Sequence, residues 1–596
     1  MKEILAMDIE CYRNYFLVMF RNLKTGNTRA FEMFEDQKLD VETIQKIINS
    51  YTIITFNGKN YDLPMLAYAL KGPNCDQLRT ASDAIIVGGV KFWEFERQFS
   101  CTIPQVDHID IFEVAPGRVS LKIYGGRLHS KKMQDLPIDP GAMITEAQRP
   151  LMRLYCGNDL ETTSELFNYL RPQIDLRVKM SKEYKIDLRS KSDAQIAEAV
   201  IALQVAKLLG RDVYRPPIFP GTGFKYRAPD YIKFTSTDMK RTLEMVENTT
   251  FVISKHGNVE MPDSLGDYKI KIGDGVYRMG IGGLHSSEVS ICHEADENEI
   301  LFDHDVASYY PAIISNSNLY PKHIGPEFLI VYKGFIEKRL LAKRGGDKTT
   351  SDVLKIFLNG SFGKFGSKWS KIYSPDLLIQ TTMTGQLALL MLIEELEHNN
   401  IKVVSANTDG IVTKCPPSMQ NIMGDIINGW ELRTKFEIES SSYKAIYFAN
   451  VNNYLALKAD GKTKTKGVFA EPGLSKNPVN EICIEAAVKF IKDKIPLKKT
   501  ILECKDIRKF VTIRAVAGGG VKDGVFLGKA VRWYYGKNSP GVIRYKTNNN
   551  TVARSEGAKP LMEISDIFPD DVNYDWYITE TKSILNVVGY YSRLIK

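Results

Sequence analysis

The chain has 596 residues, of which 44% are hydrophobic and 25% are charged, and its formal net charge is +8 at pH 7. This composition is typical of a globular protein with several domains, and no apolar run is long enough to predict a membrane span. The eight cysteines include no C-x-x-C pair, which argues against a zinc ribbon or a disulfide framework. Residues 471–596 hold 21 Lys and Arg against 14 Asp and Glu, and such a basic segment suits either a phosphate backbone or a solvated surface.

The first part of the chain predicts an α/β domain. Residues 1–185 alternate short apolar runs with helical stretches, the pattern of helices packed on a sheet. Strands are predicted over residues 4–12, 15–20 and 51–56, and a helix over 147–170.

The rest of the chain predicts a connector, a middle region and a basic C-terminal domain. A helix is predicted over residues 193–209, before a connection rich in proline and glycine at 215–229. A strand ending in acids near 300–306, two helices and a hairpin at 405–415 follow. In the last fifth, AGGGVKDG and KNSPG are predicted to be loops.

Four carboxylates and a tyrosine in the first domain are spaced so that they could meet. Asp8 and Glu10 are two apart on a predicted strand, so both project from one face. Asp62 follows a strand end, and Tyr155 and Asp159 are four apart on one helix face. Crowded carboxylates repel unless cations lie between them, and Mg²⁺ prefers such ligands. Two metals support phosphodiester hydrolysis, with Tyr155 orienting the water, although an isolated Asp-x-Glu pair on a strand is more often a solvated edge.

The order of these residues, D-x-E, then N-x-x-x-Y-D, then Y-x-x-x-D, resembles the three exonuclease motifs of DnaQ-like proofreading domains with a ribonuclease H fold. The resemblance implies 3′→5′ exonuclease activity that depends on Mg²⁺. The residues it implies are the catalytic and metal-binding Asp8, Glu10, Asp62 and Asp159, the catalytic Tyr155, and the DNA-binding Asn57.

The middle of the chain carries a second set of polar residues. Asp303 and Asp305 lie on one face of a predicted strand and are followed by Ser-Tyr-Tyr-Pro. Fifty residues after Asp305, Lys355 and Asn359 share one face of a helix. Residues 407–410 read NTDG, and Asp-Gly is a strong turn signal, so this segment by itself predicts only a hairpin tip.

The segments DVASYYP, KIFLNGSFG and NTDG resemble, in this order, motifs A, B and C of the family B DNA polymerases. YRMGIGGLHSS at 277–287 resembles the segment that links the exonuclease and polymerase regions of this family, and NNYLAL at 452–457 and KTKTKG at 462–467 resemble its primer-binding segment. The resemblance extends from residue 4 to about 470, and more loosely to DVNYDWYI, which is similar to the thumb. It implies a template-directed DNA polymerase that adds dNTPs to a primer 3′-OH.

The resemblance also implies a role for each matching residue. Asp305 and Asp409 would be catalytic and, with Val306, would hold two Mg²⁺, for which Mn²⁺ can substitute. Tyr310 would stack under the incoming sugar and select dNTP over rNTP. The expected dNTP-binding residues are Ser308, Tyr309, Tyr310, Lys343, Lys355 and Asn359. The expected DNA-binding residues in this region are Gly282, Gly283, Tyr454, Lys464 and Lys466.

Asn407 stands where motif C of the family has its first aspartate. An amide is neutral but nearly isosteric with a carboxylate and still offers an acceptor, and the second acid, Asp409, is present. We therefore expect a live polymerase with altered or weaker metal binding. Gly410 replaces a serine of the family, and Gly360-Ser361 departs from Ser-x in motif B, which bears on fidelity and primer contacts.

The expected fold class is α/β and α+β multidomain, with a ribonuclease H-like exonuclease domain followed by a right-hand polymerase. The expected segments are the exonuclease domain (1–185), the connector and start of the palm (186–299), the palm with motif A (300–332), the fingers with motif B (333–366), the palm with motif C (367–470) and a basic thumb (471–596).

The motif spacing predicts how synthesis is primed. The 50 residues from Asp305 to Lys355 leave room for two finger helices, so the insertion of protein-primed members is expected to be absent. Because Asp8 lies near the start, the domain that precedes the exonuclease in large cellular members is also expected to be absent. The chain therefore resembles a reduced, phage-type replicative polymerase. We expect a monomer, away from membranes in the cytoplasm of an infected bacterium, that extends RNA or DNA primers.

The expected partners are primer–template DNA, single-stranded DNA and dNTPs, with a processivity factor or a single-strand-binding protein. Two other functions stay open. The chain could be a 3′→5′ exonuclease whose polymerase site is impaired by Asn407, or a nucleic-acid-binding scaffold. Clustered carboxylates repel DNA, which argues against the scaffold, and Asp305 with Asp409 favours the polymerase.

Overall fold

The structure is a computed structural model that describes residues 2–590. The chain forms two compact units. Unit 1 comprises the chain up to Ser192, Pro472–Ala486 and Ile495–Thr579, and unit 2 comprises Asp193–Glu471, Ala487–Lys494 and the described residues from Glu580. Both units mix helices and strands, so the expected mixed α/β class with several parts is confirmed. The finer division into six segments stays a prediction.

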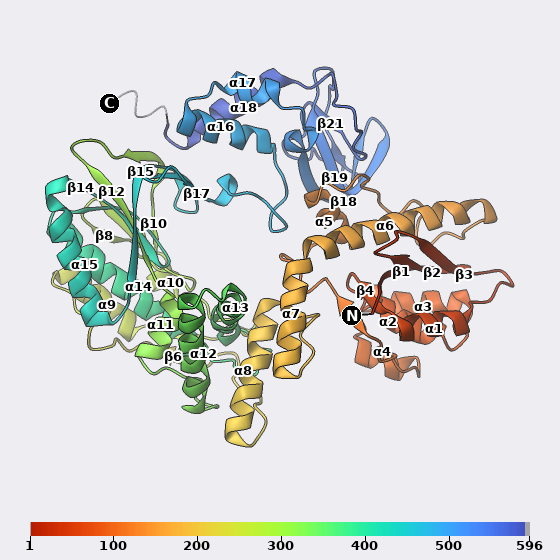
Figure 1. Cartoon of the computed structure of the whole chain (residues 1–596), viewed down its shortest axis with the longest axis horizontal. Helices are drawn as coiled ribbons and strands as arrows, with labels where there is room; N and C mark the ends of the chain where they lie inside the picture. Colours follow the sequence, from red (N-terminus) through yellow and green to blue (C-terminus); the bar gives the residue numbers. More distant parts are fainter. Residues whose placement is uncertain (1, 591–596) are drawn as a thin grey trace. The chain divides into compact units, whose positions relative to one another are not determined.

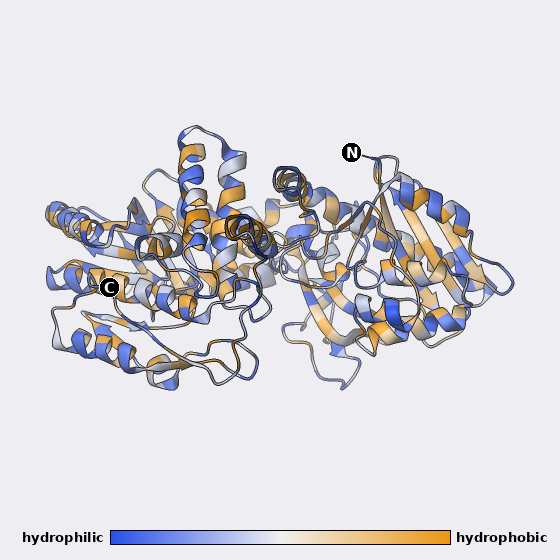
Figure 2. Cartoon of the chain, turned by 90° about the horizontal axis from the view of Figure 1, so that it is seen from below, coloured by the Kyte–Doolittle hydropathy of each residue, from blue (hydrophilic) through white to orange (hydrophobic). Residues whose placement is uncertain are grey.

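Unit 1 is built on a five-stranded sheet with the order β3-β2-β1-β4-β5. The central strand β1 is antiparallel to β2 and parallel to β4. The predicted strand over residues 4–12 is therefore confirmed, and the strands are largely apolar (orange in Figure 2). The strands are β1 (Ile4–Tyr12), β2 (Tyr15–Asn22), β3 (Thr28–Phe34), β4 (Thr52–Thr55) and β5 (His108–Asp110).

Side chains of β1 alternate between two hydrophobic cores, one on each face of the sheet. Leu5, Met7 and Ile9 lie in the core beneath α1 to α4, whereas Ala6 and Tyr12 lie in the core beneath α5 to α7 (Figure 1). The helices are α1 (Val41–Ser50), α2 (Asp62–Ala69), α3 (Cys75–Ile86), α4 (Phe92–Gln98), α5 (Leu121–Arg127), α6 (Arg149–Tyr169) and α7 (Arg171–Tyr184). The predicted helix over residues 147–170 is confirmed as α6.

The C-terminal part of unit 1 forms a four-stranded sheet with the order β20-β18-β19-β21. The prediction that AGGGVKDG is a loop is wrong, because most of it belongs to β18 and only Asp523 and Gly524 form the turn. Gly518 and Gly519 adopt φ of +75° and +94° within the strand, and a Cβ on Gly519 would lie 2.2 Å from the Phe526 ring. The glycines therefore make an irregular strand that only glycine fits. The strands are β18 (Thr512–Lys522), β19 (Val525–Tyr535), β20 (Arg544–Tyr545) and β21 (Ala558–Pro560), and the last helices of the chain are α16 (Glu481–Asp493), α17 (Leu497–Glu503) and α18 (Tyr574–Val587).

Unit 2 contains a ten-stranded sheet with the order β17-β16-β15-β12-β14-β13-β10-β9-β8, in which β11 also pairs with β15. Strand β12 lies between β14 and β15 and ends in Asp305 and Val306, the first two residues of motif A. The strands are β8 (Ile270–Ile272), β9 (Gly275–Arg278), β10 (His285–Ser286), β11 (Val289–Glu294), β12 (Ile300–Val306), β13 (Lys402–Asn407), β14 (Gly410–Cys415), β15 (Ile438–Asn450), β16 (Asn453–Lys458) and β17 (Thr463–Lys466). A short separate ladder joins β6 (Gly223–Lys225) and β7 (Thr250–Val252).

The helices of unit 2 include one, α14, that is long and apolar enough to cross a membrane by composition alone. However, 89% of its most apolar 18-residue stretch is buried, as in the core helix of a globular unit. The principal helices of this unit are α8 (Asp193–Leu209), α9 (Thr237–Asn248), α11 (Tyr309–Asn316), α12 (Glu327–Arg344), α13 (Lys348–Phe365), α14 (Pro375–His398) and α15 (Gln420–Thr434). The predicted helix over residues 193–209 is confirmed as α8.

Helix α13, which carries motif B, packs closely against α8. A Cβ on Gly360 would lie 2.9 Å from the carbonyl oxygen of Asp193 and 3.0 Å from the Cβ of Ala197. Glycine at this position of motif B therefore allows the two helices to approach each other.

Arg532 of β19 ties the C-terminal sheet of unit 1 to the segment after α5. It is fully buried and donates to the carbonyl oxygens of Ser130 (2.9 Å), Lys131 (3.2 Å), Leu561 (2.7 Å) and Met562 (3.2 Å). The guanidinium thus satisfies four carbonyls from two segments that are far apart in sequence.

Replacing Arg532 with alanine is expected to destabilise unit 1 by about 3 kcal/mol or more, because buried carbonyls would lose their donors. Urea unfolding followed by the fluorescence of the buried Trp533 measures this loss. Arg544→Ala removes an exposed arginine of β20 and should cost less than about 1 kcal/mol. Equal effects of the two variants would contradict the role of Arg532.

Candidate active sites

Strand β1 directs Asp8 and Glu10 to the face of the first sheet that α6 covers. Their neighbours Met7 and Ile9 point into the opposite core, as the alternation of a strand requires. Both acids are half-buried. The predicted arrangement of these two carboxylates on one face is confirmed.

Asp62 is the first residue of α2 and is buried. The loop before it is held by Asp110 at the end of β5, which accepts from the backbone N–H groups of Asn57 (2.9 Å) and Lys59 (3.0 Å). Asn57 itself has a φ of +66°. No sequence pattern pointed to Asp110, because its role depends on the neighbouring parallel strand.

Helix α6 presents Tyr155 and Asp159 on one face, and Lys122 of α5 lies beside both. The Lys122 ammonium is ion-paired with the Asp159 carboxylate and lies 4.4 Å from the centre of the Tyr155 ring. Sequence reasoning missed Lys122, since a single lysine on a short helix gives no local signal. The first cluster is thus four acids, a tyrosine and one cation.

Burial and crowding raise the pKa of every carboxyl group in this cluster. Burial first, and the charge of Asp159 second, raise the pKa of Asp8 to about 7 against the opposing charge of Lys122. The pKa values of Glu10, Asp62 and Asp159 are also raised, chiefly by burial. The Oδ1 atom of Asp62 is buried without a hydrogen-bond partner. A divalent cation would relieve the repulsion and satisfy this oxygen, so the residues fit Mg²⁺.

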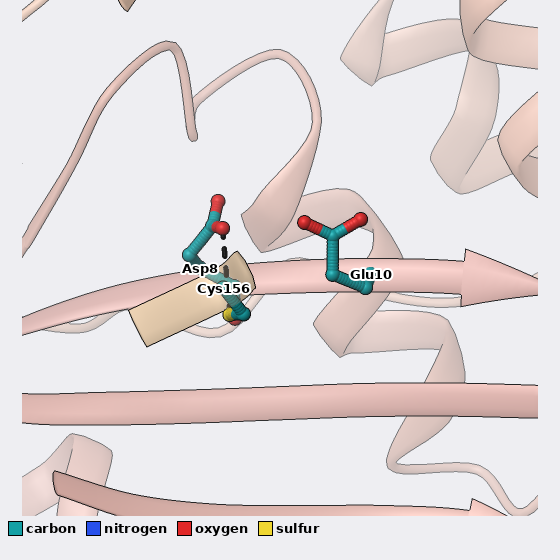
Figure 3. A group of neighbouring side chains, drawn as sticks. All are labelled: Asp8, Glu10 and Cys156. Atoms are coloured by element: carbon teal, nitrogen blue, oxygen red, sulfur yellow. Dashed lines mark hydrogen bonds between the residues drawn. The ribbon is translucent and has the colours of Figure 1, made fainter. Parts of the chain in front are cut away.

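Cys156 lies behind the carboxylates and adds a thiol to the cluster (Figure 3). Its Sγ donates to Oδ2 of Asp8 at 3.5 Å. One potential ligand atom each from Asp8, Glu10 and Cys156 lies within 4.8 Å of the others. Burial first, and then the charge of Asp8, raise the pKa of Cys156, so the thiol keeps its proton and acts as a donor.

The second cluster lies in unit 2, where β12 ends beside the turn between β13 and β14. Asp305 lies opposite Gly410 on β14 and Glu439 on β15. The Val306 N–H donates to the carbonyl of Asp409 at 2.8 Å. The hairpin at 405–415 is therefore confirmed, and it brings Asp409 next to the end of motif A.

The turn that carries Asp409 is held by the Gly282-Gly283 segment. Thr408, with a φ of +58°, donates its N–H to the carbonyl of Leu284 at 2.8 Å. A Cβ on Gly283 would lie 3.0 Å from the Cα of Thr408. Gly283 thus allows the backbone to pass close behind the turn, and a side chain there would push the turn away, whereas a Cβ on Gly282 would meet open space.

Asn407 uses its amide as a hydrogen-bond donor. Its Nδ2 donates to the backbone carbonyl of Val451 at 2.7 Å, and its Oδ1 accepts from Oγ1 of Thr408 at 3.2 Å. Val451 lies in the turn between β15 and β16, so the amide ties that turn to the turn of Asp409. A carboxylate has no proton to donate, so this backbone arrangement requires asparagine rather than aspartate.

Tyr310 lies in the first turn of α11 and stacks on Phe362 of α13, with ring centres 4.2 Å apart. Its hydroxyl donates to the carbonyl of Gly282 at 2.6 Å. Lys355 and Asn359 are exposed on α13 and share one face with Phe362, seven and three residues away. That face of α13 is therefore turned toward the end of motif A, and motifs A, B and C meet there.

The side chain of Tyr309 does not contact the face of α13 on which Phe362 lies. The ring is buried, and its hydroxyl donates to the carbonyl of Gly385 in α14 at 2.6 Å. Ser308 precedes it with a φ of +50°, and the rings of Tyr309 and Tyr310 lie nearly parallel with centres 6.1 Å apart.

Arg339 of α12 reaches Ser308 and was missed by sequence reasoning. Its Nη1 donates to the Ser308 hydroxyl at 2.8 Å, and its Nε is buried without a partner. Lys343, one turn later on the same face, lies 3.4 Å from Glu439 as an exposed ion pair. The four-residue spacing of these two cations on one helix was the available signal.

Strand β17 directs Lys464 and Lys466 to one face, where Lys466 pairs with Tyr454 of β16. The Nζ atom of Lys464 lies 2.7 Å from Asp303 Oδ2 and 2.9 Å from Asp305 Oδ2. Lys464 thus offsets part of the charge of Asp303 and of Asp305, the first residue of motif A.

Opposed charges set the pKa values of the second cluster. Partial loss of water, and then the charge of Asp305, raise the pKa of Asp409 against the two lysines. Burial lowers the pKa of Lys464, but the carboxylates of Asp303 and Asp305 outweigh it, so the net pKa is raised. For Lys466 burial prevails and the pKa is lowered. A divalent cation would compete with Lys464 for Asp305, and oxygen ligands of this kind suit Mg²⁺.

Asn407→Asp is expected to lower stability rather than to restore a lost metal ligand. Two acceptor oxygens would face each other where Nδ2 now donates to Val451, at a cost of about 1–3 kcal/mol. Melting of the metal-free protein, followed by circular dichroism, measures the effect. Asn421→Asp on the exposed side of α15 is the matched control and should change little. A more stable Asn407→Asp protein would contradict the donor role.

Removing the charge at Asp8 is expected to stabilise the metal-free protein above neutral pH. The folded pKa of Asp8, about 7, exceeds the ordinary value of 3.8, so the stability from protonating Asp8 is present below about 4 and is lost as the pH rises through 7. Melting in EDTA from pH 5 to 8.5 should therefore show a smaller decline for Asp8→Asn than for the wild type, and Mg²⁺ should restore the wild type. Asp36→Asn, an exposed control, should follow the wild type. Identical profiles for Asp8→Asn and wild type would contradict the crowding.

A scan against models of known protein families gives no match. Three archaeal relatives match part of the chain. DNA polymerase 1 of Sulfolobus acidocaldarius is 27% identical over 159 residues, which are 26% of this chain and 18% of that protein. DNA polymerase 1 of Aeropyrum pernix is 24% identical over 204 residues, which are 28% of this chain and 21% of that protein. The corresponding protein of Saccharolobus solfataricus is 26% identical over 138 residues, or 22% of this chain and 15% of that protein.

The chain thus spans at most 21% of the length of these three relatives. Among solved structures, the family B DNA polymerase of Pyrobaculum calidifontis is 16% identical, with a TM-score of 0.42, and the match covers 98% of this chain and 78% of that chain. Together with motifs A, B and C, the sequence matches support the relationship of this chain to the family B DNA polymerases.

Proposed function

We propose that the chain is a template-directed DNA polymerase that also carries a 3′→5′ proofreading exonuclease. The observation that carries the polymerase proposal is the junction of β12 with the 407–410 turn, where the Val306 N–H donates to the Asp409 carbonyl at 2.8 Å and Asp305 lies opposite Gly410. Carboxylates from motifs A and C, far apart in sequence, thereby share one edge of the sheet. The archaeal relatives named DNA polymerase 1 add support.

In the proposed reaction, the primer 3′-hydroxyl attacks the α-phosphate of a dNTP, and the bond to pyrophosphate breaks. Asp305 and Asp409, with the carbonyl of Val306, would hold two Mg²⁺. When bound, these ions supply neutralisation of the charge that develops on the phosphate. Lys464 holds Asp305 in the metal-free protein, and release of this ion pair would turn its ammonium toward a primer phosphate, together with Lys466.

The proposed dNTP pocket lies against the face of α13 that Tyr310 contacts. The Tyr310 ring is stacked on Phe362 and fixed by its bond to Gly282, so a 2′-hydroxyl on the incoming sugar would meet a rigid surface. Lys355 and Asn359 on this face, and Arg339 and Lys343 on α12, would bind the triphosphate or support the pocket. Arg339 is the best supported of the cations, because its Nε is buried without a partner and an anion would satisfy it.

In the exonuclease reaction, Asp8, Glu10, Asp62 and Asp159 would hold Mg²⁺, which can be replaced by Mn²⁺. Tyr155 would orient the attacking water. Lys122, ion-paired with Asp159 beside the Tyr155 ring, would offset negative charge at the scissile phosphate. The buried, unpartnered Oδ1 of Asp62 is the feature that most supports cation binding here.

The proposal includes a finer division of the fold into an exonuclease domain, palm, fingers and thumb. A five-stranded sheet with the acids on its central strand and helices on both faces supports a ribonuclease H-like exonuclease domain. The ten-stranded sheet of unit 2 supports a palm, and the pair α12 and α13 supports fingers. The sheet of the basic C-terminal segment supports a thumb. The relatives named are archaeal, so a phage or viral origin, an infected bacterial cytoplasm, the monomeric state and a processivity partner stay predictions without support from them.

A 3′→5′ exonuclease with an impaired polymerase site is the second candidate. Asn407 favours it, because the amide is committed to Val451 and leaves two motif carboxylates, Asp305 and Asp409. Glu439 lies opposite Asp305 on β15 and is 69% exposed, so it offers a further oxygen ligand at this edge and weakens the case for impairment.

The test uses a 5′-labelled primer on a longer template with Mg²⁺, with and without dNTPs. Asp305→Asn should lower extension by on the order of 100-fold or more and leave 3′ trimming intact, because only the charge at motif A is removed. Asp8→Ala should lower trimming to a similar degree and leave extension intact. Gel electrophoresis of the labelled strand measures both.

Asp296→Asn, on the exposed loop before β12, is the control and should change neither activity. Trimming without extension by the wild type, in Mg²⁺ and in Mn²⁺, would contradict the first candidate and support the second. Loss of both activities in either variant would contradict two separate sites.

A further inference from the structure

An aromatic and cationic surface in unit 2 has no part in the proposed active sites. We call it the Trp369 surface and define it by Arg211, Tyr214, Arg215, Lys368 and Trp369. It borders a cavity of about 200 Å³ between the segment that follows α8 and the segment that follows α11. Of these residues, only Arg215 lies in the predicted connection rich in proline and glycine at 215–229.

The two rings of this surface are unusually open to solvent. Trp369 is 75% exposed and Tyr214 is 70% exposed, whereas Trp430 and Trp533 are fully buried. Tryptophan is among the residues most buried on average, so a ring left in water on a folded protein points to a ligand that covers it.

Cations surround the rings and hold them in place. The guanidinium of Arg215 lies 5.8 Å, and the ammonium of Lys368 5.1 Å, from the centre of the Trp369 ring. Arg215 also donates to the carbonyl of Lys368 at 3.1 Å, which ties the two segments together. Arg211 and Tyr214 line the cavity beside them. The rings are therefore presented on a backbone that is already ordered.

Nearby acids are mostly neutralised, so the surface keeps a positive balance. Glu198 is ion-paired with Lys364 at 2.8 Å, and Asp376 is ion-paired with Lys322 at 3.1 Å. Asp212 accepts weakly from the Tyr214 hydroxyl at 3.5 Å. A ligand for this surface should thus carry negative charge and flat, unpaired rings.

We propose that the Trp369 surface binds single-stranded nucleic acid. Unpaired bases stack on exposed aromatic rings, and a chain of phosphates is attracted to arginine and lysine beside them. A duplex hides the faces of its bases, so it would use the cations but not the rings. An acidic protein segment would use the cations too, but it offers few flat rings for Trp369 and Tyr214.

The position of the surface suggests which strand it takes, and this step rests on the proposed polymerase function. Trp369 follows Phe362, the ring that stacks on Tyr310, by seven residues, so the two Cα atoms lie within about 25 Å. Template nucleotides that are not yet paired are the single strand nearest to a polymerase site. The Trp369 surface would therefore hold the template ahead of synthesis.

Binding is tested without catalysis, by fluorescence anisotropy of a labelled 20-nucleotide oligo(dT) in EDTA. Trp369→Ala and Tyr214→Ala should each weaken binding about fivefold or more, and Trp369→Phe should stay within about twofold of the wild type, because a ring is kept. Arg215→Ala should weaken binding and reduce the salt dependence by about 0.7 in the logarithmic slope. The double variant Lys240→Ala/Arg241→Ala, on the exposed side of α9, removes more charge and should bind as the wild type does.

Unchanged oligo(dT) binding by both Trp369→Ala and Tyr214→Ala, with melting temperatures equal to the wild type, would overturn the proposal. Equal loss of binding to a blunt duplex would also overturn it, because a surface that reads unpaired bases should spare the duplex. Extension is measured separately on templates with overhangs of 2 and 20 nucleotides. On the long overhang, more Trp369→Ala protein than wild-type protein should be required for the same extension, whereas on the short overhang the two should be equal. If the wild type extends neither template, the polymerase function fails while the binding result still decides the single-strand proposal.

Discussion

Mutual repulsion of carboxylates is the interaction on which both clusters depend. In unit 1, the acids of β1, α2 and α6 are crowded in a site that is largely removed from water, and Lys122 offsets part of their charge. In unit 2, Lys464 does the same for Asp303 and Asp305. In both places a lysine holds like charges together, so under the proposed function a divalent cation would exchange with the positive charge of the lysine rather than fill an empty space.

A different property of a β-sheet brings the acids together in each unit. In unit 1, the two-residue alternation of β1 separates an apolar face from a face that carries Asp8 and Glu10. In unit 2, the strand register brings the acids together, because the pairing of β12 with β14 places Asp305 beside the turn that carries Asp409. The first device is robust to the loss of a neighbouring strand, whereas the second fails if the hairpin slips by one residue.

Local periodicity predicted the elements that carry the sites, namely β1, α6, β12 and the 405–415 hairpin. It also predicted which side chains share a face. What it could not predict are contacts made between distant segments. Lys122 and Asp110 have no local signal, because each is defined by a partner on another element. For Arg339 the only local signal was its four-residue spacing from Lys343, and its contact with Ser308 is made between distant segments. The glycines of β18 gave a misleading signal, since φ above zero serves an irregular strand as well as a loop. The burial of Tyr309 beneath α14 was equally invisible.

The hydrogen bond from Asn407 to Val451 also limits which side chains position 407 can accept. The side chain at 407 and the backbone conformation at 451 are coupled, so each is tolerated only in the presence of the other. A carboxylate at position 407 would face the Val451 carbonyl oxygen without a proton to donate, so the turn at 451 would have to rearrange to accept aspartate. The side chain at 407 and the neighbouring turn therefore constrain each other, and a change of one alone carries a penalty that a matching change of the other could remove.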